Sequence, residues 1–581
     1  HHCQTGANCG HQSQLTPPMH LPSANPRPSI YYNYQVFNPW LPTENGIQEK
    51  KKVVIVGAGP AGMVTALELA RHGVASVVLA SDLQFSQGSR AIVFTRRSME
   101  ILQQVGVAHR IAENGLPWRC GNSIYRGQKV FRMETPLDPD DRFFPMINIQ
   151  QQYLEEYLHD ACAAHSLIEV RWGNKLVSAE QKTGTVTAHV DTSAGPYQLE
   201  TEWLVAADGG RSEIRSAMNL KLEGASFESI FVIADIRIDL PYPTERLAFF
   251  DPDWNRGNTI LMHKEPHGIW RVDYQLPPGE TPEEALRPES LQERIDAQLK
   301  MIGFEGKPWE MDWSSVYSAR TLTLPQYVHD RIVFTGDAAH LLPIFGVRGA
   351  NTAFQDAQSL GWHLAYVLQG IAPEKLMANH SQERVGAARE IITEAGKSTR
   401  FMAPPSRGFR LLRDAVLSLS LTEEFVRPLY HWRTSRPHEY KHSALNSTSD
   451  DNAQFTDGPS LGAPPQNVQL QQDDFLLDHL GGGFDLVYVA TLQGIPQDLK
   501  RAVDQAKNKG LPLKLLAITQ KNVDVTGADK TLFDPQQRFQ LRYAVSAGGA
   551  YLFRPDQHVC GRWLQVDATR LLSSLQLAVM Q

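Results

Sequence analysis

The chain has 581 residues, 42% of them hydrophobic and 20% charged, and this composition excludes wholesale disorder. Lys and Arg number 56 against 63 Asp and Glu, which leaves a net charge of −7 at pH 7; this balance argues against an extended surface for nucleic acid. No apolar run reaches the ~18 residues of a membrane helix, and five cysteines are too few for a disulfide framework. We therefore expect an enzyme-sized, cytoplasmic protein without a membrane span.

Residues 1–46 differ in composition from the rest of the chain. Cys3, Cys9 and His11 superficially resemble metal ligands, but their spacing fits no structural zinc pattern, so we predict no metal site. From Pro17 to Pro42 the sequence is rich in Pro, Asn, Ser and Tyr. We expect an extended arm that lies on the body through its aromatic side chains.

The first strong motif is a glycine-rich turn between two predicted strands. The apolar run Val53–Val56 predicts a buried parallel strand, and a helix over 63–72 and a strand over 74–79 follow. Three glycines have the GxGxxG spacing: Gly57, Gly59 and Gly62. In this βαβ context the turn and the helix N-terminus form a site for a dinucleotide pyrophosphate.

A carboxylate at the end of the second strand would bind the adenosine ribose. The position directly after that strand is Ala80, and the nearest carboxylate is Asp82. Asp82 or Ser81 takes this contact, or the contact is missing.

Two later motifs follow buried strands. Asp208-Gly209 ends one strand, and Gly336-Asp337 ends the strand over 332–335. A glycine-rich turn over 346–349 then leads into a helix from about Asn351 to Gln369. Asp337 is placed to accept a hydrogen bond from a sugar-alcohol hydroxyl, and the N–H groups that open the helix suit a ring that gains negative charge on reduction.

Together these three motifs resemble the class A flavin-dependent monooxygenases, the aromatic hydroxylase family. The resemblance covers residues 50–400 and is nearest in character to the 3-(3-hydroxyphenyl)propionate hydroxylases and phenol hydroxylases. Ser89-Arg90-Ala91 and the segment around Gln151 are further similarities.

The resemblance implies an FAD cofactor and assigns its contacts. The three glycines of the first motif would cradle the pyrophosphate, with Asp82 as the candidate for the ribose. Arg90 and Gln151 would approach the flavin, and Asp208 would support both FAD and the encounter with NAD(P)H. Gly336 and Asp337 would bind the ribityl chain. The flavin ring would be lined by Pro343, Gly349 and Asn351.

The implied function is hydroxylation of a small aromatic, phenolic substrate. NADPH or NADH reduces FAD, O₂ gives the flavin C4a-hydroperoxide, and the activated ring takes its distal oxygen. A second GxGxxG is absent, which favours this family. Two alternatives stay open: a flavoenzyme of the same fold that inserts oxygen beside a ketone, and a non-catalytic flavoprotein that binds a pathway intermediate.

The region 226–320 is the predicted substrate domain, an antiparallel sheet. Along 268–277 Trp270 and Tyr274 fall on one face and Arg271 and Asp273 on the other. His263, which shares a face with Leu261, and Tyr274 are the catalytic candidates for phenol deprotonation, beside His267; the alternative is that they are ordinary sheet residues. We expect Arg271 and Asp273 to form a structural ion pair.

The predicted fold class is α/β, with a GxGxxG Rossmann-like FAD domain that contains the inserted substrate domain. The FAD domain comprises 47–225 and 321–400. An aromatic-rich helical segment, 401–440, is where we expect a homodimer contact. A linker over 441–472 precedes a thioredoxin-like domain, 473–581, that has no CxxC and for which we expect a packing role.

Overall fold

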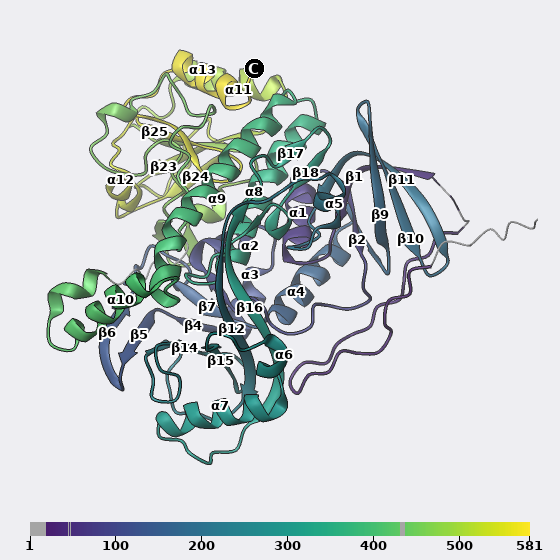
Figure 1. Cartoon of the computed structure of the whole chain (residues 1–581). Helices are drawn as coiled ribbons and strands as arrows, with labels where there is room; N and C mark the ends of the chain where they lie inside the picture. The colour runs from purple at the N-terminus through teal and green to yellow at the C-terminus, as the bar shows by residue number, and fades with distance from the viewer. Residues whose placement is uncertain (1–18, 44–45, 47, 430–435) are drawn as a thin grey trace, which may run out of the picture.

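The computed structural model describes residues 19–43, 46, 48–429 and 436–581 (Figure 1). Cys3, Cys9 and His11 therefore lie outside the described residues, as does part of the predicted helical segment. The described chain is a mixed α/β protein with two eight-stranded sheets, a five-stranded C-terminal sheet and two small sheets.

The first sheet carries the glycine-rich turn. Its strand β1 (Gln48–Val56) lies between β11 (Gly195–Ala206) and β2 (Ser76–Ala80), and both pairings are parallel. The strand order is β17-β18-β11-β1-β2-β8, and β9 and β10 extend the sheet beside β11. These further strands are β8 (Ile168–Trp172), β9 (Lys175–Lys182), β10 (Thr185–Thr192), β17 (Val328–His329) and β18 (Ile332–Phe334).

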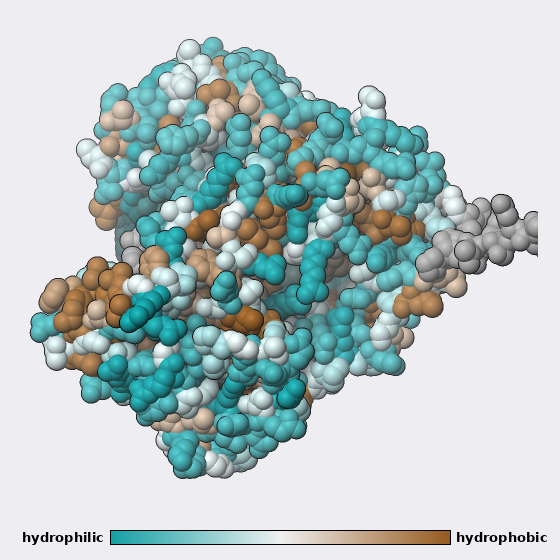
Figure 2. All heavy atoms as spheres, viewed as in Figure 1, coloured by the Kyte–Doolittle hydropathy of each residue, from teal (hydrophilic) through white to brown (hydrophobic). Residues whose placement is uncertain are grey.

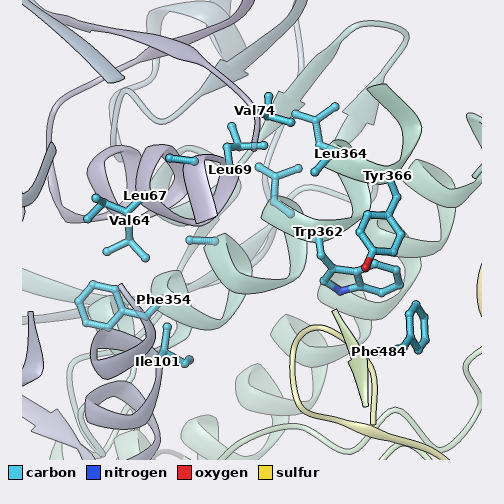
Figure 3. Packing of buried hydrophobic residues seen from close by; sticks show 14 of the residues in the cluster. Val64, Leu67, Leu69, Val74, Ile101, Phe354, Trp362, Leu364, Tyr366 and Phe484 are labelled. Atoms are coloured by element: carbon cyan, nitrogen blue, oxygen red, sulfur yellow. The ribbon is translucent and has the colours of Figure 1, made fainter. Parts of the chain in front are cut away.

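Two helices that begin at the candidate binding turns pack against each other. Helix α1 (Pro60–Arg71) starts directly after the glycine-rich turn, and α8 (Gly349–Leu368) follows the second glycine-rich turn. Val64 and Leu67 of α1 and Phe354 of α8 are buried in one apolar core (Figure 3). The neighbouring elements are α2 (Arg96–Gln104), α3 (Ala108–Asn114), α4 (Gln151–Ala164), α5 (Glu213–Ala217), α9 (Lys375–Met402), the 3₁₀ turn η1 (Gly336–Ala338), and the small sheet of β3 (Val93–Thr95), β4 (Leu116–Trp118) and β7 (Met146–Asn148).

The second eight-stranded sheet, called the roof sheet below, has the order β19-β16-β12-β15-β14-β13-β5-β6. Its pairings are antiparallel except that β13 and β5 run parallel. The helix α7 (Pro288–Met301) covers one face through an apolar core that includes Trp270, Leu291 and Ile295. Its elements are β5 (Cys120–Tyr125), β6 (Gln128–Glu134), β12 (Glu223–Arg237), β13 (Arg246–Phe250), β14 (Thr259–Lys264), β15 (Ile269–Gln275), β16 (Glu310–Thr323), β19 (His340–Leu341) and α6 (Pro282–Ala285).

The sheet predicted over 226–320 is thus larger in the structure. Strands β5 and β6 come from residues 120–134, which precede the predicted substrate domain. They join because β13 would otherwise leave an open edge, and β5 fills it over Arg246–Phe250.

The C-terminal sheet has the order β24-β23-β22-β25-β26. Strands β25 and β26 pair as an antiparallel hairpin, and Cys560 is buried within it. The thioredoxin-like assignment remains a prediction. The elements are β20 (Gln469–Gln471), β21 (Asp474–Phe475), β22 (Phe484–Val489), α11 (Gln497–Asn508), β23 (Leu513–Thr519), β24 (Lys530–Phe533), α12 (Arg538–Arg542), β25 (Ala550–Phe553), β26 (Val559–Trp563), α13 (Ala568–Ala578), and the 3₁₀ turns η3 (Asn452–Gln454) and η4 (Leu476–His479).

Two features tie this unit to the rest of the chain. The segment 441–472, expected to be a linker, packs along the hairpin: the N–H of Ser447 donates to the carbonyl of Cys560 at 2.8 Å. Buried ion pairs connect the hairpin to α9, with Arg554 Nη1 2.6 Å from Glu383 Oε1. We call the following residues the junction cluster: Asp356, Glu383, Arg384, Arg554 and Asp556.

Apolar side chains gather on an outlying helix, α10 (Arg407–Ser420), and the 3₁₀ turn η2 (Glu424–Leu429), at the lower left of Figure 2. Among the exposed ones are Phe409, Leu411, Leu412 and Phe425. This face lies in the segment where we predict a homodimer contact, and that prediction stays open. In the described part of the chain, no helix combines the length and apolar character needed to cross a membrane.

Candidate active site

A cavity of about 1060 Å³ lies between the first sheet and the roof sheet. One side is formed by Gly59–Ala61 at the start of α1 and by Gly349–Asn351 at the start of α8. The opposite side is formed by β12, β14, β15 and β16 of the roof sheet, through residues such as Leu261 and Tyr317. Two helix N-termini therefore face a sheet across one large space.

The three glycines of the first motif have different roles. A Cβ at Gly57, where φ is +115°, would lie 2.1 Å from the carbonyl oxygen of Ala207, and one at Gly62 would lie 1.9 Å from the carbonyl oxygen of Gly57. These two glycines let α1 approach the sheet. A Cβ added at Gly59 would have no atom within 4 Å, and Gly59 lines the cavity. The turn thus presents bare backbone at a helix N-terminus, which fits a pyrophosphate.

The carboxylate of Asp337 faces the cavity, where Arg90 and Gln151 also lie. The surrounding protein atoms raise the pKa of the Asp337 carboxyl, although the residue is exposed, and the nearby His340 and Arg90 oppose this shift. The side chain of Gln151 accepts from the N–H of Ala91 at 3.0 Å, which fixes the loop that carries Arg90. Three residues predicted to contact the flavin and its ribityl chain are thus brought together.

The start of α8 is held by Asn351. Its Oδ1 accepts from the N–H of Thr95 at 3.0 Å and from Ser98 Oγ at 2.5 Å, so the side chain anchors the helix to β3. Gly349 lines the cavity, and a Cβ there would meet no atom within 4 Å. Gly336 serves packing, because a Cβ there would lie 2.8 Å from that of Ala61.

Besides Gly57, Gly62 and Gly336, three further predicted site residues lie outside the cavity wall. Asp208 supports the start of α5: its carboxylate accepts from Oγ of the N-cap residue Ser212 at 2.6 Å and from the N–H of Ile214 at 3.3 Å. Pro343 is buried, while its neighbours Leu342 and Ile344 line the cavity. Tyr274 faces away from the cavity and packs into the core under α7.

The face of β15 that lines the cavity is the one opposite to Tyr274, and it carries Arg271 and Asp273. Because β14, β15, β12 and β16 are adjacent, their register places two rows of residues side by side. One row is His263, Arg271, Asp235 and Trp313, and the next is Leu261, Asp273, Ile233 and Ser315. The prediction that Leu261 and His263 share a face is confirmed, and both line the cavity.

A group of polar residues occupies this face, and all of them are buried except the half-buried Tyr317. Arg271 pairs with Asp235, whose two oxygens lie 2.9 and 3.0 Å from Nε and Nη2. The predicted ion pair of Arg271 with Asp273 is therefore wrong, because Asp235 on the neighbouring strand takes the guanidinium. We call the following residues the roof cluster: Asp235, His263, Glu265, Arg271, Asp273 and Tyr317.

Protonation in the roof cluster is strongly shifted. Burial raises the pKa of Asp273 to about 7 against the opposing charge of Arg271. Burial and the charges of Arg246 and Arg271 lower the pKa of His263 to about 3, so its imidazole is neutral at pH 7. Asp273 Oδ1 and Tyr317 Oη have no hydrogen-bond partner among the described residues, and both side chains line the cavity.

Sequence reasoning missed Asp273 and Tyr317 as functional candidates. The available signal for Asp273 was the presence of two charged residues, Arg271 and Asp273, on one face of a strand that is otherwise mostly apolar. Apolar side chains also line the wall, Leu261, Val316 and Phe345 among them, and such side chains suit an aromatic ring.

The family of the chain follows from residues 50–395, which match the model of the FAD binding domain family. The chain belongs to this family, and the bare glycine turn, the two helix N-termini and Asp337 fit FAD.

A 3-(3-hydroxy-phenyl)propionate/3-hydroxycinnamic acid hydroxylase of Comamonas testosteroni is 29% identical over 381 residues, which is 65% of this chain and 63% of the relative. The hydroxylase of the same name from Escherichia coli O8 is 27% identical over 374 residues, 64% of this chain and 66% of that protein. The alignments thus span just under two thirds of these relatives.

Solved structures share the fold over nearly the whole chain. The flavin-dependent monooxygenase PieE, in complex with FAD and substrate, superposes with a TM-score of 0.76 at 21% identity, covering 92% of this chain and 99% of PieE. Aklavinone-11 hydroxylase with FAD and aklavinone gives a TM-score of 0.73 at 23% identity, covering 91% of this chain and 99% of that one. The fold similarity therefore includes the C-terminal unit.

Proposed function

We propose that the chain is an FAD-dependent monooxygenase that consumes NADPH or NADH and O₂ to hydroxylate a small phenolic compound. The observation that carries this proposal is the roof cluster: an unpartnered carboxylate whose pKa is about 7 lines the same cavity as the flavin-binding turns. The names of the aligned relatives, which are hydroxylases of phenolic acids, support the substrate class.

The protein residues hold the cofactor in a fixed direction. The N-terminus of α1 binds the pyrophosphate, Asp337 accepts from the ribityl chain, and the N-terminus of α8 faces the flavin ring. FAD bound there would supply hydride acceptance from the nicotinamide and activation of O₂ for transfer to the substrate. The roof sheet closes the opposite side and limits access of water.

The substrate hydroxyl loses its proton to Asp273 in this proposal. A base is most effective when its pKa is near the working pH, and the pKa of about 7 at Asp273 meets this condition, whereas that of about 3 at His263 does not. Neutral His263 and the hydroxyl of Tyr317 then orient the phenolate by hydrogen bonds. Tyr274, on the other face of β15, has no part in this step.

The test is NADPH and NADH oxidation by the FAD-loaded protein with a panel of phenols and phenolic acids, followed by product analysis. We expect one phenol to accelerate oxidation and to gain one oxygen atom. A ketone that becomes an ester would favour the oxygen-insertion alternative. Ligand binding that perturbs the flavin spectrum without faster oxidation would favour a binding protein.

A further inference from the structure

A second, smaller cavity continues the main one at the end of β2. Its volume is about 280 Å³, and its walls are residues 23 and 25–28 of the N-terminal arm together with Asp82, Gln84 and Gln87. Arg27, Asp82 and Gln87 line both cavities. The arm, drawn in purple in Figure 1, therefore forms part of the wall of the cofactor space.

The arm is fixed at this place by specific contacts. The N–H of Arg27 donates to Gln84 Oε1 at 2.8 Å, and Gln84 Nε2 donates back to the carbonyl of Asn25 at 3.0 Å. The guanidinium of Arg27 also donates to the carbonyl of Phe85. Farther along, Tyr32 and Tyr34 are buried against the loop after β2, which confirms the expected aromatic anchoring.

The arm meets the strand end that lacks the usual carboxylate. Strand β2 ends at Ala80, which is buried and offers no acceptor side chain. Asp82 is two residues farther on, and Arg27 Nη2 holds its Oδ2 at 3.2 Å. Among the described residues, Asp82 Oδ1 accepts no hydrogen bond, and the carboxylate is open to both cavities.

The order of the wall residues matches the order of groups in FAD. The strand order β18-β11-β1-β2 places Asp82, which follows β2, on one side of the glycine turn that follows β1, and Asp337, which follows β18, on the other side. Arg27 lies with Asp82, on the side away from Asp337. We propose that the arm supplies the adenosine subsite of FAD. Arg27 holds Asp82 so that its free oxygen accepts from a ribose hydroxyl, and the segment 25–28 walls the adenine. This inference depends on FAD binding and not on hydroxylation.

The experiment compares the affinities of the apoprotein, in its full-length chain, for FAD and for FMN, which lacks the adenosine. Flavin fluorescence titration of Arg27→Ala should show FAD binding about tenfold weaker, because a charge-assisted contact is lost, with FMN binding unchanged. AMP should compete with FAD in the unaltered protein and less well in the variant. Asp82→Asn should behave like Arg27→Ala, and the double variant should add little.

Two controls keep the outcomes distinct. Arg126→Ala removes a surface arginine that pairs with Asp251 and should change neither affinity, whereas Asp337→Ala should weaken FAD and FMN alike. Equal loss of FAD and FMN affinity in Arg27→Ala, or no loss of either, would overturn the proposal. Arg27→Gln, which keeps most of the side-chain volume, replaces the alanine variant if circular dichroism shows that the latter is misfolded. Failure of hydroxylation in the previous assay leaves these expectations unaltered.

Discussion

The roof cluster and the junction cluster are both buried and highly charged, yet they are built in opposite ways. In the junction cluster each carboxylate has an arginine partner: Arg554 Nη2 lies 2.7 Å from Asp556 Oδ2, and Arg384 Nε lies 2.6 Å from Asp356 Oδ1. The roof cluster has three carboxylates but one arginine, Arg271. Both oxygens of Asp235 accept hydrogen bonds from its guanidinium.

The pKa values of the carboxyl groups in the two clusters differ accordingly. Burial alone would raise the pKa of Glu383, but Arg554 outweighs it and lowers the pKa to about 2. Burial and the charge of Asp235 raise the pKa of Glu265 well above its ordinary value, and the pKa of Asp273 reaches about 7. Paired charges thus link two parts of the fold, whereas an excess of carboxylates over arginines leaves carboxyl groups that retain a proton near pH 7.

The largest effect should come from Asp273→Asn. The amide keeps the shape of the carboxylate but cannot take a proton, so we expect the hydroxylation rate to fall by about 10²- to 10⁴-fold with FAD still bound. Stopped-flow and steady-state rates with a phenolic substrate measure this. Tyr274→Phe is the matched control on the opposite face of β15 and should keep its rate; loss of rate in both variants would assign the effect to the strand and not to the carboxylate.

Arg554→Met tests the structural role of the junction cluster. Without the guanidinium, Glu383 and Asp556 are buried charges with no counter-charge, and we expect the free energy of unfolding to fall by about 3–5 kcal/mol. Urea titration followed by tryptophan fluorescence measures the change. Arg570→Met, which removes a partly exposed arginine paired with Asp451, should cost under about 1 kcal/mol. Similar losses in both variants would remove the distinction between buried and surface pairs.

The pH dependence of the rate tests the raised pKa that distinguishes the roof cluster from the junction cluster. Asp273 must be ionised to accept a proton, so kcat/KM should fall about tenfold per pH unit below its pKa of about 7 and reach a plateau above it. The same raised pKa opposes stability as pH rises from the ordinary value of 3.8 toward 7, because the folded state retains a proton that the unfolded chain releases. A rate profile that is flat from pH 5 to 8, with product formation rate-limiting, would exclude Asp273 as the base.

The smallest effect concerns acid stability. Glu383 has a lowered pKa, so its contribution is complete above its ordinary value of 4.5 and is lost as pH falls toward 2. Glu383→Gln should therefore reduce the pH dependence of unfolding in this window and leave the rate profile near pH 7 unchanged. An identical acid transition in the variant would assign the loss of stability to other carboxylates.

Local motifs were predicted well because each is contained in a short stretch of chain. The apolar run before Gly57, and Asp337 directly after a buried strand, required no knowledge of distant residues. The alternation along β15 also gave the two faces correctly. The alternation could not show which face lines the cavity, because all seven residues of the strand are buried. The face with Tyr274, predicted as a catalytic candidate, packs into the core instead.

Contacts between distant segments could not be predicted from the sequence. Arg271 and Asp235 are 36 residues apart, and Arg27 and Asp82 are 55 apart. Each pair depends on a strand or arm placement that only the assembled fold determines. The prediction of an Arg271–Asp273 pair failed for this reason, since proximity along one strand was the only guide available.

The parallel pairing of β13 with β5 limits which segments of this protein can be exchanged with those of a relative. A chimera that exchanges only residues 226–320 would bring in a β13 whose neighbour is still the original β5, along five residues from Arg246 to Phe250. Mismatched neighbours would expose an edge strand to aggregation. Transplanting a new substrate specificity therefore requires two insertions, with 120–134 carried alongside 226–320 as one exchangeable module.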